Sequence, residues 1–327
     1  MEEQIISEPA IAETSYPPKP EMNEKGQAIA KSLLSFGLYI LVFYLFFSWD
    51  LKSIFLLTLA LIIHEMGHLI AMKAFGYKDV NIFFVPLLGA YVTGSKSRIS
   101  QRQNVIMLLA GPVPGVFIGF GLAIAGYMQQ NAALFGAANI FVILNLFNML
   151  PIMPLDGGKV LKSMFFENNE IINTVFISIS IIILIVLCVV LESYYLLLVP
   201  YLLIMQLVNQ SQVKKARQEI RELGIDLSKT YEELTDREYW TIRDVLAEHI
   251  KYYSRIIRRA EHVPAENEDK VISGVNDILQ TPPIKDLGVG GKVLVIFIGI
   301  ACFLVAVVTA FLYSYYLSAL SQQQFQF

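Results

Sequence analysis

Long apolar runs separated by short polar connections recur along the chain. Most of these runs are close to the roughly 20 residues that a helix needs to cross the hydrocarbon core of a bilayer. Because backbone groups at that depth find no water, a spanning run is expected to be helical. The pattern predicts an all-α polytopic membrane protein with about six to seven transmembrane helices. The runs are Leu33–Trp49, Leu51–Phe75, Val105–Met128, Ala133–Leu150, Ile171–Leu191, Tyr194–Val208 (short, and so tilted or only partly inserted) and Val293–Leu317.

Two polar stretches interrupt this pattern and divide the chain. Residues 1–30 contain Pro17, Pro18 and Pro20 and lack a signal-peptide core, so a disordered cytoplasmic arm is expected there. A transmembrane domain is predicted over 31–208, a cytoplasmic helical segment over 209–290, and a last membrane helix with a short tail over 291–327. Within the polar segment, "TDRE" from Thr235 to Glu238 is a capping box ahead of helically spaced apolar residues. The segment is interpreted as either an inactive connector or a site for a regulatory protein.

The composition agrees with a membrane protein and excludes some classes of function. The 327 residues are 55% hydrophobic and only 16% charged, and the mean hydropathy is +0.55. The net charge of −3 gives no indication of a nucleic-acid partner. Cys188 and Cys302, the two cysteines, both lie in apolar runs, so neither a disulfide framework nor a cysteine metal site is expected.

Basic residues lie in alternate connections and indicate the orientation. If the N-terminus is cytoplasmic, all the basic loops fall on the cytoplasmic side, as the positive-inside rule requires. We therefore expect a multi-pass protein of the cytoplasmic (plasma) membrane. The basic residues that carry this argument are Lys73, Lys78, Lys96, Arg98, Arg102, Lys159, Lys162, Lys214, Lys215, Arg217 and Arg221.

The second run carries three ionisable residues where lipid would favour apolar ones. "HEMGH", from His64 to His68, matches H-E-x-x-H, in which two imidazoles one helical turn apart can hold one Zn²⁺. Glu65, between them, can act as the general base toward a zinc-activated water. A chance match is a poor explanation, because each ionisable side chain at membrane depth costs a few kcal/mol. The chain has only four histidines, and the other two, His249 and His262, lie in the polar segment.

A catalytic zinc usually has three protein ligands, and Asp156 is the third one that the sequence favours. It follows the fourth run in "NMLPIMPLDGG", where Pro151 and Pro154 interrupt the helix and two glycines allow close backbone approach. The second and fourth runs both reach the cytoplasmic side near these motifs. Asn148, one turn before Pro151, could stabilise an oxyanion or simply form a helix–helix hydrogen bond.

These two motifs together resemble the site-2 protease family of intramembrane zinc metalloproteases. HEMGH matches the family's H-E-x-x-H, and Asn148–Gly158 matches its N-x-x-P-x-x-P-L-D-G-G. The resemblance covers about Leu51–Val160 and implies a three-helix catalytic core, placed at about 51–165. It further implies that His64, His68 and Asp156 bind one zinc ion per chain, that Glu65 is the catalytic base and that Asn148 assists substrate or transition-state binding.

Two further stretches resemble parts of the same family. "IFFVPLLGAYV", Ile82–Val92, is similar to its short β-strand loop at the membrane edge, although an ordinary interfacial loop remains an alternative. In "AGPVPG", Ala110–Gly115, Gly115 occupies a position where the family usually has asparagine. No inserted PDZ domain and no pair of CBS modules is evident in the sequence.

The sequence thus predicts an intramembrane zinc metalloprotease that hydrolyses peptide bonds of single-span membrane proteins. Two alternatives use the same ligands: a metal transporter or sensor, and an inactive relative that binds membrane helices without cutting them. Metal transport does not explain Glu65, the glutamate directly after the first histidine. The complete set of three ligands and one base argues against an inactive relative.

Overall fold

The computed structural model describes residues 16–21, 28–47, 51–85, 89–95, 100–166, 169–257, 262–279 and 284–324. The chain divides into two compact units. Residues 24–207 and 282–327 form the first, here named the membrane unit, and residues 1–23 and 208–281 form the second, named the polar unit. Of the arm that the sequence predicts to be disordered, 1–15 and 22–27 lie outside the described residues.

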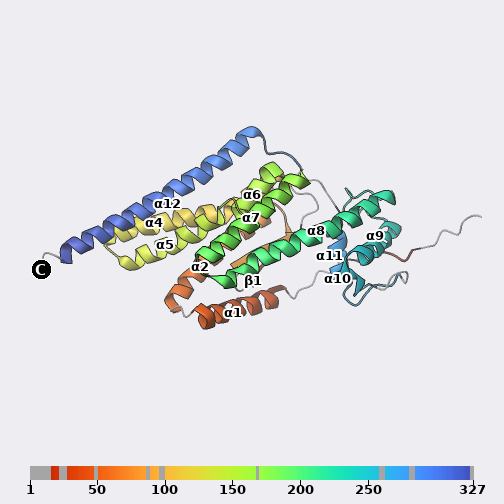
Figure 1. The fold of residues 1–327 in the computed structure, drawn as a ribbon, viewed down its shortest axis with the longest axis horizontal. Coiled ribbons are helices and arrows are strands. Elements are labelled where there is room, and N and C mark those ends of the chain that lie inside the picture. The colour runs from red at the N-terminus through yellow and green to blue at the C-terminus, as the bar shows by residue number, and fades with distance from the viewer. Residues whose placement is uncertain are drawn as a thin grey trace, which may run out of the picture. The chain divides into compact units, whose positions relative to one another are not determined.

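The membrane unit is built from helices, as the hydropathy pattern predicts. Five helical stretches among the described residues are long and apolar enough to cross a membrane: Leu51–Ala74, Gln101–Gln129, Glu170–Val190, Tyr194–Glu222 and Val289–Ala319. The fold is therefore an all-α polytopic membrane protein with one small sheet (Figure 1). The helices are α1 (Ala28–Phe47), α2 (Leu51–Ala74), α3 (Gln101–Ala110), α4 (Pro112–Gln129), α5 (Ala132–Asn148), α6 (Asp156–Leu161), α7 (Glu170–Val190), α8 (Leu198–Glu222) and α12 (Val289–Gln324), with short turns η1 (Lys162–Phe166) and η2 (Tyr194–Leu197).

Three predicted runs differ in detail from the helices observed. The third run is two helices, α3 and α4, because Gly111 and Pro112 interrupt the hydrogen-bond ladder between them. The sixth run does not end at Val208; α8 continues to Glu222 through good helix formers, and Gly224, at φ +78°, stands just beyond its end. The last helix is longer at both ends than Val293–Leu317.

Helices α4, α5 and α12 pack side by side in the membrane unit (Figure 1). Small residues allow the close approach: Ala123 and Ala138 are fully buried, and a Cβ at Gly119 would press on Val142. Tyr316 of α12 stacks on Phe135 of α5, with ring centroids 4.7 Å apart. The helix that follows the polar segment is thus an integral part of the membrane unit.

A β-hairpin follows α2, where the sequence predicts a strand loop. Strands β1 (Lys78–Val85) and β2 (Gly89–Ser95) pair antiparallel, with Val85 opposite Gly89 and Ile82 opposite Val92. Phe84 packs on α1 through the rings of Phe36 and Tyr39. In the described part of the chain the sheet has these two strands only, so the outer edge of each has no strand partner.

The polar unit is a small helical module with its own core. Helices α9 (Asp236–His249), α10 (Lys251–Ser254) and α11 (Glu268–Ile278) pack with the end of α8. The predicted capping box is present: Thr235 Oγ1 accepts from Glu238 N at 3.3 Å, and Glu238 Oε2 accepts from Thr235 N at 2.9 Å. Arg243, fully buried, pairs with Glu268 at 3.0 Å between Nε and Oε1.

Candidate metal centre

The two histidines of HEMGH lie on the buried face of α2 and point at one spot. His64 is 2% exposed and His68 is 8% exposed, and their Nε2 atoms lie 3.1 Å apart. This arrangement follows from the spacing, because residues four apart on a helix lie one above the other on the same face. Two imidazole nitrogens on one turn can therefore share one ligand.

Asp156 arrives at the same spot from α6. Its Oδ2 atom lies 3.0 Å from His64 Nε2 and 3.1 Å from His68 Nε2, while Oδ1 pairs with Lys159 Nζ at 3.2 Å. The ligand atoms of His64, His68 and Asp156 all lie within 4.8 Å of one another, and all three residues are buried. The structure thus brings together the three residues that the sequence selects as metal ligands.

The chain reaches this position by a tight turn between α5 and α6. Helix α5 ends at Asn148, and the prolines of "LPIMP" prevent its continuation. A Cβ at Gly157 would overlap the Met149 carbonyl, and one at Gly158 would overlap the Ile152 carbonyl. Only glycine therefore lets the start of α6 fold back onto the end of α5, which holds Asp156 against α2.

The opposite ring nitrogen of each histidine is held by a hydrogen-bond acceptor. His68 Nδ1 donates to the Met107 carbonyl at 2.7 Å, and a carbonyl can only accept. His64 Nδ1 lies 2.8 Å from Asn145 Oδ1, and Asn145 Nδ2 donates to the Phe141 carbonyl at 2.7 Å. That second bond fixes the orientation of the amide, so Asn145 presents its oxygen to His64. In a neutral ring, each Nδ1 then carries the proton and each Nε2 carries a free lone pair.

The donor set and its spacing fit a zinc ion. When both rings are neutral, two nitrogen lone pairs and a carboxylate oxygen face one another, an arrangement that a cation makes favourable. Ligands about 2.0–2.1 Å from a tetrahedral zinc lie roughly 3.3–3.4 Å apart. The observed separations of 3.0–3.1 Å are close to this value. Two histidines and one carboxylate also leave a fourth position for water or substrate, as in catalytic zinc sites.

Asn145 is a contact of the site that the sequence analysis did not single out. It is fully buried on α5, one turn before Asn148. A Cβ at Gly115 of α4 would overlap the Asn145 amide, so the asparagine occupies the space that this glycine leaves open. A polar residue within an apolar helix was the available signal, because such residues usually have a partner.

Close packing of α2 on the α3–α4 junction also depends on glycine. A Cβ at Gly67 would overlap the Ala110 carbonyl, and a Cβ at Gly111 would overlap the His68 ring. The missing side chain of Gly67 leaves a space on this face of α2. The structure shows that this space is filled by the backbone of α3.

All five predicted site residues line one cavity of about 650 Å³. Glu65 is 4% exposed and borders it beside the histidines. Asn148 borders it too, with its Nδ2 donating to the Leu144 carbonyl of its own helix at 3.1 Å. The other lining residues are mostly apolar, and many come from β2, α3, α7, η2 and α8, including Val92, Met107, Leu184, Cys188, Leu203 and Gln206.

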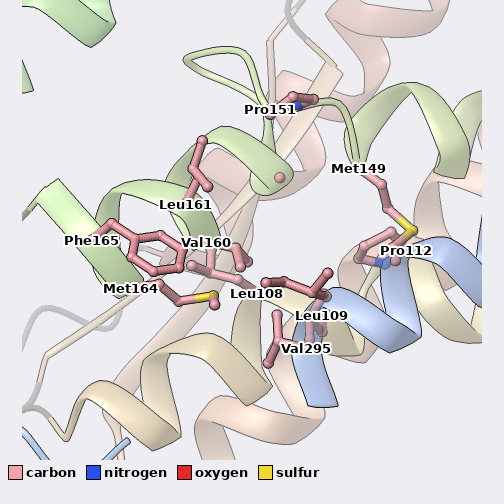
Figure 2. Close-up of a pocket in the computed structure, with 13 residues that line it drawn as sticks. Leu108, Leu109, Pro112, Met149, Pro151, Val160, Leu161, Met164, Phe165 and Val295 are labelled. Carbon is pink, nitrogen blue, oxygen red and sulfur yellow. The ribbon is translucent and has the colours of Figure 1, made fainter. Parts of the chain in front are cut away.

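A second, apolar cavity of about 150 Å³ is lined in part by residues of the α5–α6 turn (Figure 2). Met149 and Pro151 of the turn, Val160 and Met164 beyond it, and Val295 of α12 contribute to its wall. Asp156 is not part of this lining, although the adjacent Gly157 is. The segment that carries Asp156 thus borders both cavities, because Asp156 lines the first and Gly157 lines the second.

The remaining two histidines lie in the polar unit, as the sequence predicts. His249 Nε2 contacts Glu219 Oε2 at 2.5 Å, and His262 Nε2 lies 3.5 Å from Asp244 Oδ2. Among the described residues, His64, His68 and Asp156 form the one cluster of three or more His, Cys, Asp or Glu side chains with metal-binding geometry.

Comparison with known proteins agrees with this geometry. Residues 56–154 match the family described as "Putative zincin peptidase". Stage IV sporulation protein FB of Bacillus subtilis is 29% identical over 119 residues, which are 35% of this chain and 41% of that protein. A "Putative zinc metalloprotease" of Synechocystis sp. is 32% identical over 121 residues (34% of this chain, 31% of that protein), and a zinc metalloprotease of Methanocaldococcus jannaschii is 28% identical over 113 residues (33% and 32%).

These similarities support the resemblance to site-2 proteases and the assignment of Zn²⁺ to the site. The chain covers 31–41% of the length of these relatives, and the family match covers 99 of its 327 residues. The match includes His64, Glu65, His68 and Asn148 and ends two residues before Asp156. The chain thus matches the zincin peptidase family over the part that contains the HEMGH motif.

Proposed function

We propose that this protein is an intramembrane zinc metalloprotease that hydrolyses peptide bonds of membrane-spanning proteins. The observation that carries the proposal is the convergence of His64, His68 and Asp156, from two separate motifs, on the wall of a cavity that also holds Glu65. In this proposal the three residues hold one zinc ion. Asn145 and the Met107 carbonyl keep the two rings oriented toward it.

The chemistry follows from the residues around the cavity. A bound zinc ion supplies Lewis acidity, which activates water and polarises a carbonyl. Glu65 takes a proton from the attacking water and passes it to the leaving amine as the C–N bond breaks and a C–O bond forms. Asn148 Nδ2 can stabilise the developing oxyanion after turning away from the Leu144 carbonyl, which costs the helix one side-chain contact.

The carbonyl groups of a substrate helix accept hydrogen bonds from the same helix. The helix must therefore unwind locally before a peptide bond is cut. The hairpin offers a surface for the unwound segment, because β2 has no second strand partner among the described residues and its Val92 lines the cavity. Strand addition to such an edge holds an extended peptide through its backbone. We therefore propose that substrate enters beside β2, and that residues weakening the substrate helix promote cleavage.

We further propose that the N-terminus and the open side of the site face the cytoplasm, and that the protein resides in the cytoplasmic membrane. The distribution of lysine and arginine among the connections supports this orientation. The proposed partners are a single-span substrate protein, the lipid bilayer and a regulatory protein that binds the segment 209–290.

The test is cleavage in proteoliposomes that contain a panel of single-span helices with glycine or proline placed at different depths. Mass spectrometry identifies new termini inside the spans. Wild type is expected to produce them in a zinc-dependent manner. Glu65→Gln removes the base and is expected to abolish them while zinc stays bound. Glu266→Gln, an exposed change in the polar unit, is the matched control and retains cleavage.

The same vesicles separate the proposal from its alternatives. A zinc-sensitive dye inside the lumen reports transport. Zinc flux that persists in Glu65→Gln, with no cleavage by wild type, would establish a transporter. Substrate that co-purifies with wild type but is never cut would establish an inactive relative.

A further inference from the structure

The segment Tyr16–Glu21, within the arm that the sequence predicts to be disordered, packs on the polar unit. Its sequence is "YPPKPE", and three of its residues directly precede a proline. Proline fixes its own φ near −65°, and it drives the preceding residue into extended conformations. The segment is therefore pre-set as an extended, polyproline-like chain with three residues per turn. Pro17 and Pro20 lie on one face and are half-buried, whereas Pro18 is exposed, as that repeat requires.

Two aromatic side chains of the polar unit bind carbonyls of the segment one turn apart. Trp240 Nε1 donates to the Pro17 carbonyl at 2.6 Å, and the Tyr231 hydroxyl donates to the Pro20 carbonyl at 2.6 Å. Lys19 has the single backbone N–H between Pro17 and Pro20, and it donates to Asp236 Oδ1 at 2.8 Å. These three hydrogen bonds depend on the spacing of Pro17 and Pro20 along an extended segment. They do not require the segment to form a helix or a strand.

Lys19 adds a contact that is specific for a primary ammonium group. Its Nζ lies 2.8 Å from the Tyr231 carbonyl, 3.0 Å from the Glu232 carbonyl and 2.6 Å from the Leu234 carbonyl. An ammonium has three N–H donors, so the three carbonyls satisfy all of them. The Tyr231 ring lies 5.2 Å from Nζ and adds a cation–π contact.

The surface that receives the segment is held in place by the core of the polar unit. Trp240 is fully buried, and the Arg243 guanidinium lies 4.9 Å from its ring centroid. Arg243 is in turn fixed by Glu268 of α11. Tyr16 completes the contact by packing on His262, with ring centroids 4.9 Å apart. This surface is therefore formed by residues more than 200 positions away from Tyr16–Glu21 in the sequence. Contacts within the polar unit, such as those of Arg243 with Trp240 and Glu268, also hold these residues in place.

We propose that this surface, named the proline groove and formed by Tyr231, Leu234, Asp236, Trp240 and His262, is a recognition site for extended peptides of the pattern Pro-x-Lys-Pro. The chain's own Tyr16–Glu21 is its resident ligand, bound within the same molecule. The site selects two carbonyls one polyproline turn apart and one lysine ammonium between them. A protein that presents the same pattern competes for the groove. Recognition at this surface involves neither the metal centre nor proteolysis.

The first test measures whether the resident segment can be exchanged in the unaltered full-length protein in detergent. An amine-specific acetylating reagent is applied, and mass spectrometry compares Lys19 with Lys270, which is exposed. Lys19 is expected to react at least tenfold more slowly, because its nitrogen is bonded to three carbonyls. Excess YPPKPE peptide, with blocked ends, is expected to raise the Lys19 rate toward that of Lys270. The same peptide with norleucine in place of lysine is expected not to.

The second test uses a full-length variant in which Pro17, Pro18, Lys19 and Pro20 are all replaced by serine. Fluorescent YPPKPE peptide is expected to bind this variant saturably and to bind wild type at least tenfold more weakly, because the wild-type groove is filled. A peptide with alanine at the position of Pro18, which is exposed, is expected to bind equally well. Trp240→Phe in the serine background removes the N–H donor and is expected to weaken binding.

Three results would overturn the proposal. One is a Lys19 that is as reactive as Lys270 without peptide. Another is a protected Lys19 that no excess of peptide exposes, which would make the segment a fixed part of the core. Protection that disappears on dilution would show that the segment comes from a second copy rather than from the same chain.

Discussion

The contacts of individual atoms decide how the two imidazole rings behave. Met107 supplies a carbonyl and Asn145 an amide oxygen, and each holds one Nδ1–H. Both Nε2 lone pairs are therefore directed at the Asp156 carboxylate and at the ion proposed to lie between them. The pattern of the sequence identified His64 and His68 because these residues are costly inside a membrane, and it identified Asp156 because its motif reaches the same side after the fourth run.

Replacing Asn145 tests the hydrogen bond that orients the His64 ring. Asn145→Leu is expected to weaken zinc binding about 10–100-fold, because His64 loses the acceptor that fixes its tautomer and orientation. Asn145→Asp keeps an acceptor and is expected to retain most of the affinity. Competition with a chelator of known zinc affinity measures the change.

Asn148→Leu is the matched control for that experiment. Asn148 lies on the same helix as Asn145 and lines the cavity of the metal centre. Its amide donates a hydrogen bond to the Leu144 carbonyl of its own helix rather than to either histidine. Its zinc affinity is expected to equal that of wild type. An equal loss in both variants would show that Asn145 acts through general packing.

The sequence could not have shown the roles of Met107 and Asn145. A backbone carbonyl carries no signal in the side-chain pattern, and Asn145, a polar residue among apolar neighbours, indicates a partner without identifying it. Its partner, His64, lies 81 residues away and is reached only when α2 and α5 pack. Spacing identifies chemistry on one helix, but contacts between helices depend on how they pack.

At the scale of helices and strands, glycine sets how closely the elements that form the metal centre approach one another. Helix α2 meets the α3–α4 junction at Gly67 and Gly111, and the start of α6 meets the end of α5 at Gly157 and Gly158. Hydropathy and prolines located these helices, and the resemblance of Ile82–Val92 to the strand loop of site-2 proteases located the hairpin. Hydropathy did not locate the end of α8, because a run of good helix formers carries the helix past the last apolar residue.

Two glycine substitutions measure how much this close packing contributes to the free energy of unfolding. Gly111→Ala is expected to lower the free energy of unfolding by roughly 1–3 kcal/mol, because the new methyl group overlaps the His68 ring. The φ of −75° at Gly111 is also favourable for alanine, so the expected loss of stability comes from the steric overlap and not from backbone strain. Gly121→Ala on α4 meets open space and is expected to be neutral or to stabilise by up to about 1 kcal/mol. Unfolding in mixed detergent–SDS micelles provides the measurement, and equal effects would contradict this account.

At the scale of the whole molecule, the chain combines a membrane unit that holds the metal centre with a polar unit that holds the proline groove. The sequence indicated a helical polar segment and its capping box. It did not indicate that Tyr16–Glu21 packs on this segment, because the partners are more than 200 residues apart and the contacts depend on carbonyl groups.

The proposed orientation can be tested with single cysteines in a background where Cys188 and Cys302 are serine. Cysteines replacing Lys78 and Arg221 are expected on the cytoplasmic side, because they lie in basic connections. Cysteines replacing Gln129 and Tyr194 are expected outside. A membrane-impermeant maleimide should label the second pair in intact cells and the first pair only after permeabilisation. The reverse labelling would contradict the orientation.

The central claim is that His64, His68 and Asp156 hold a catalytic zinc, and the zinc content of purified variants tests it most directly. Elemental analysis of the wild type is expected to give about one zinc per chain, with X-ray absorption showing nitrogen and oxygen ligands at about 2.0–2.1 Å and no sulfur. Glu65→Gln is expected to keep this zinc, whereas Asp156→Ala is expected to lose it. A wild type that binds no zinc, or an Asp156→Ala variant that binds as much zinc as wild type, would contradict the account.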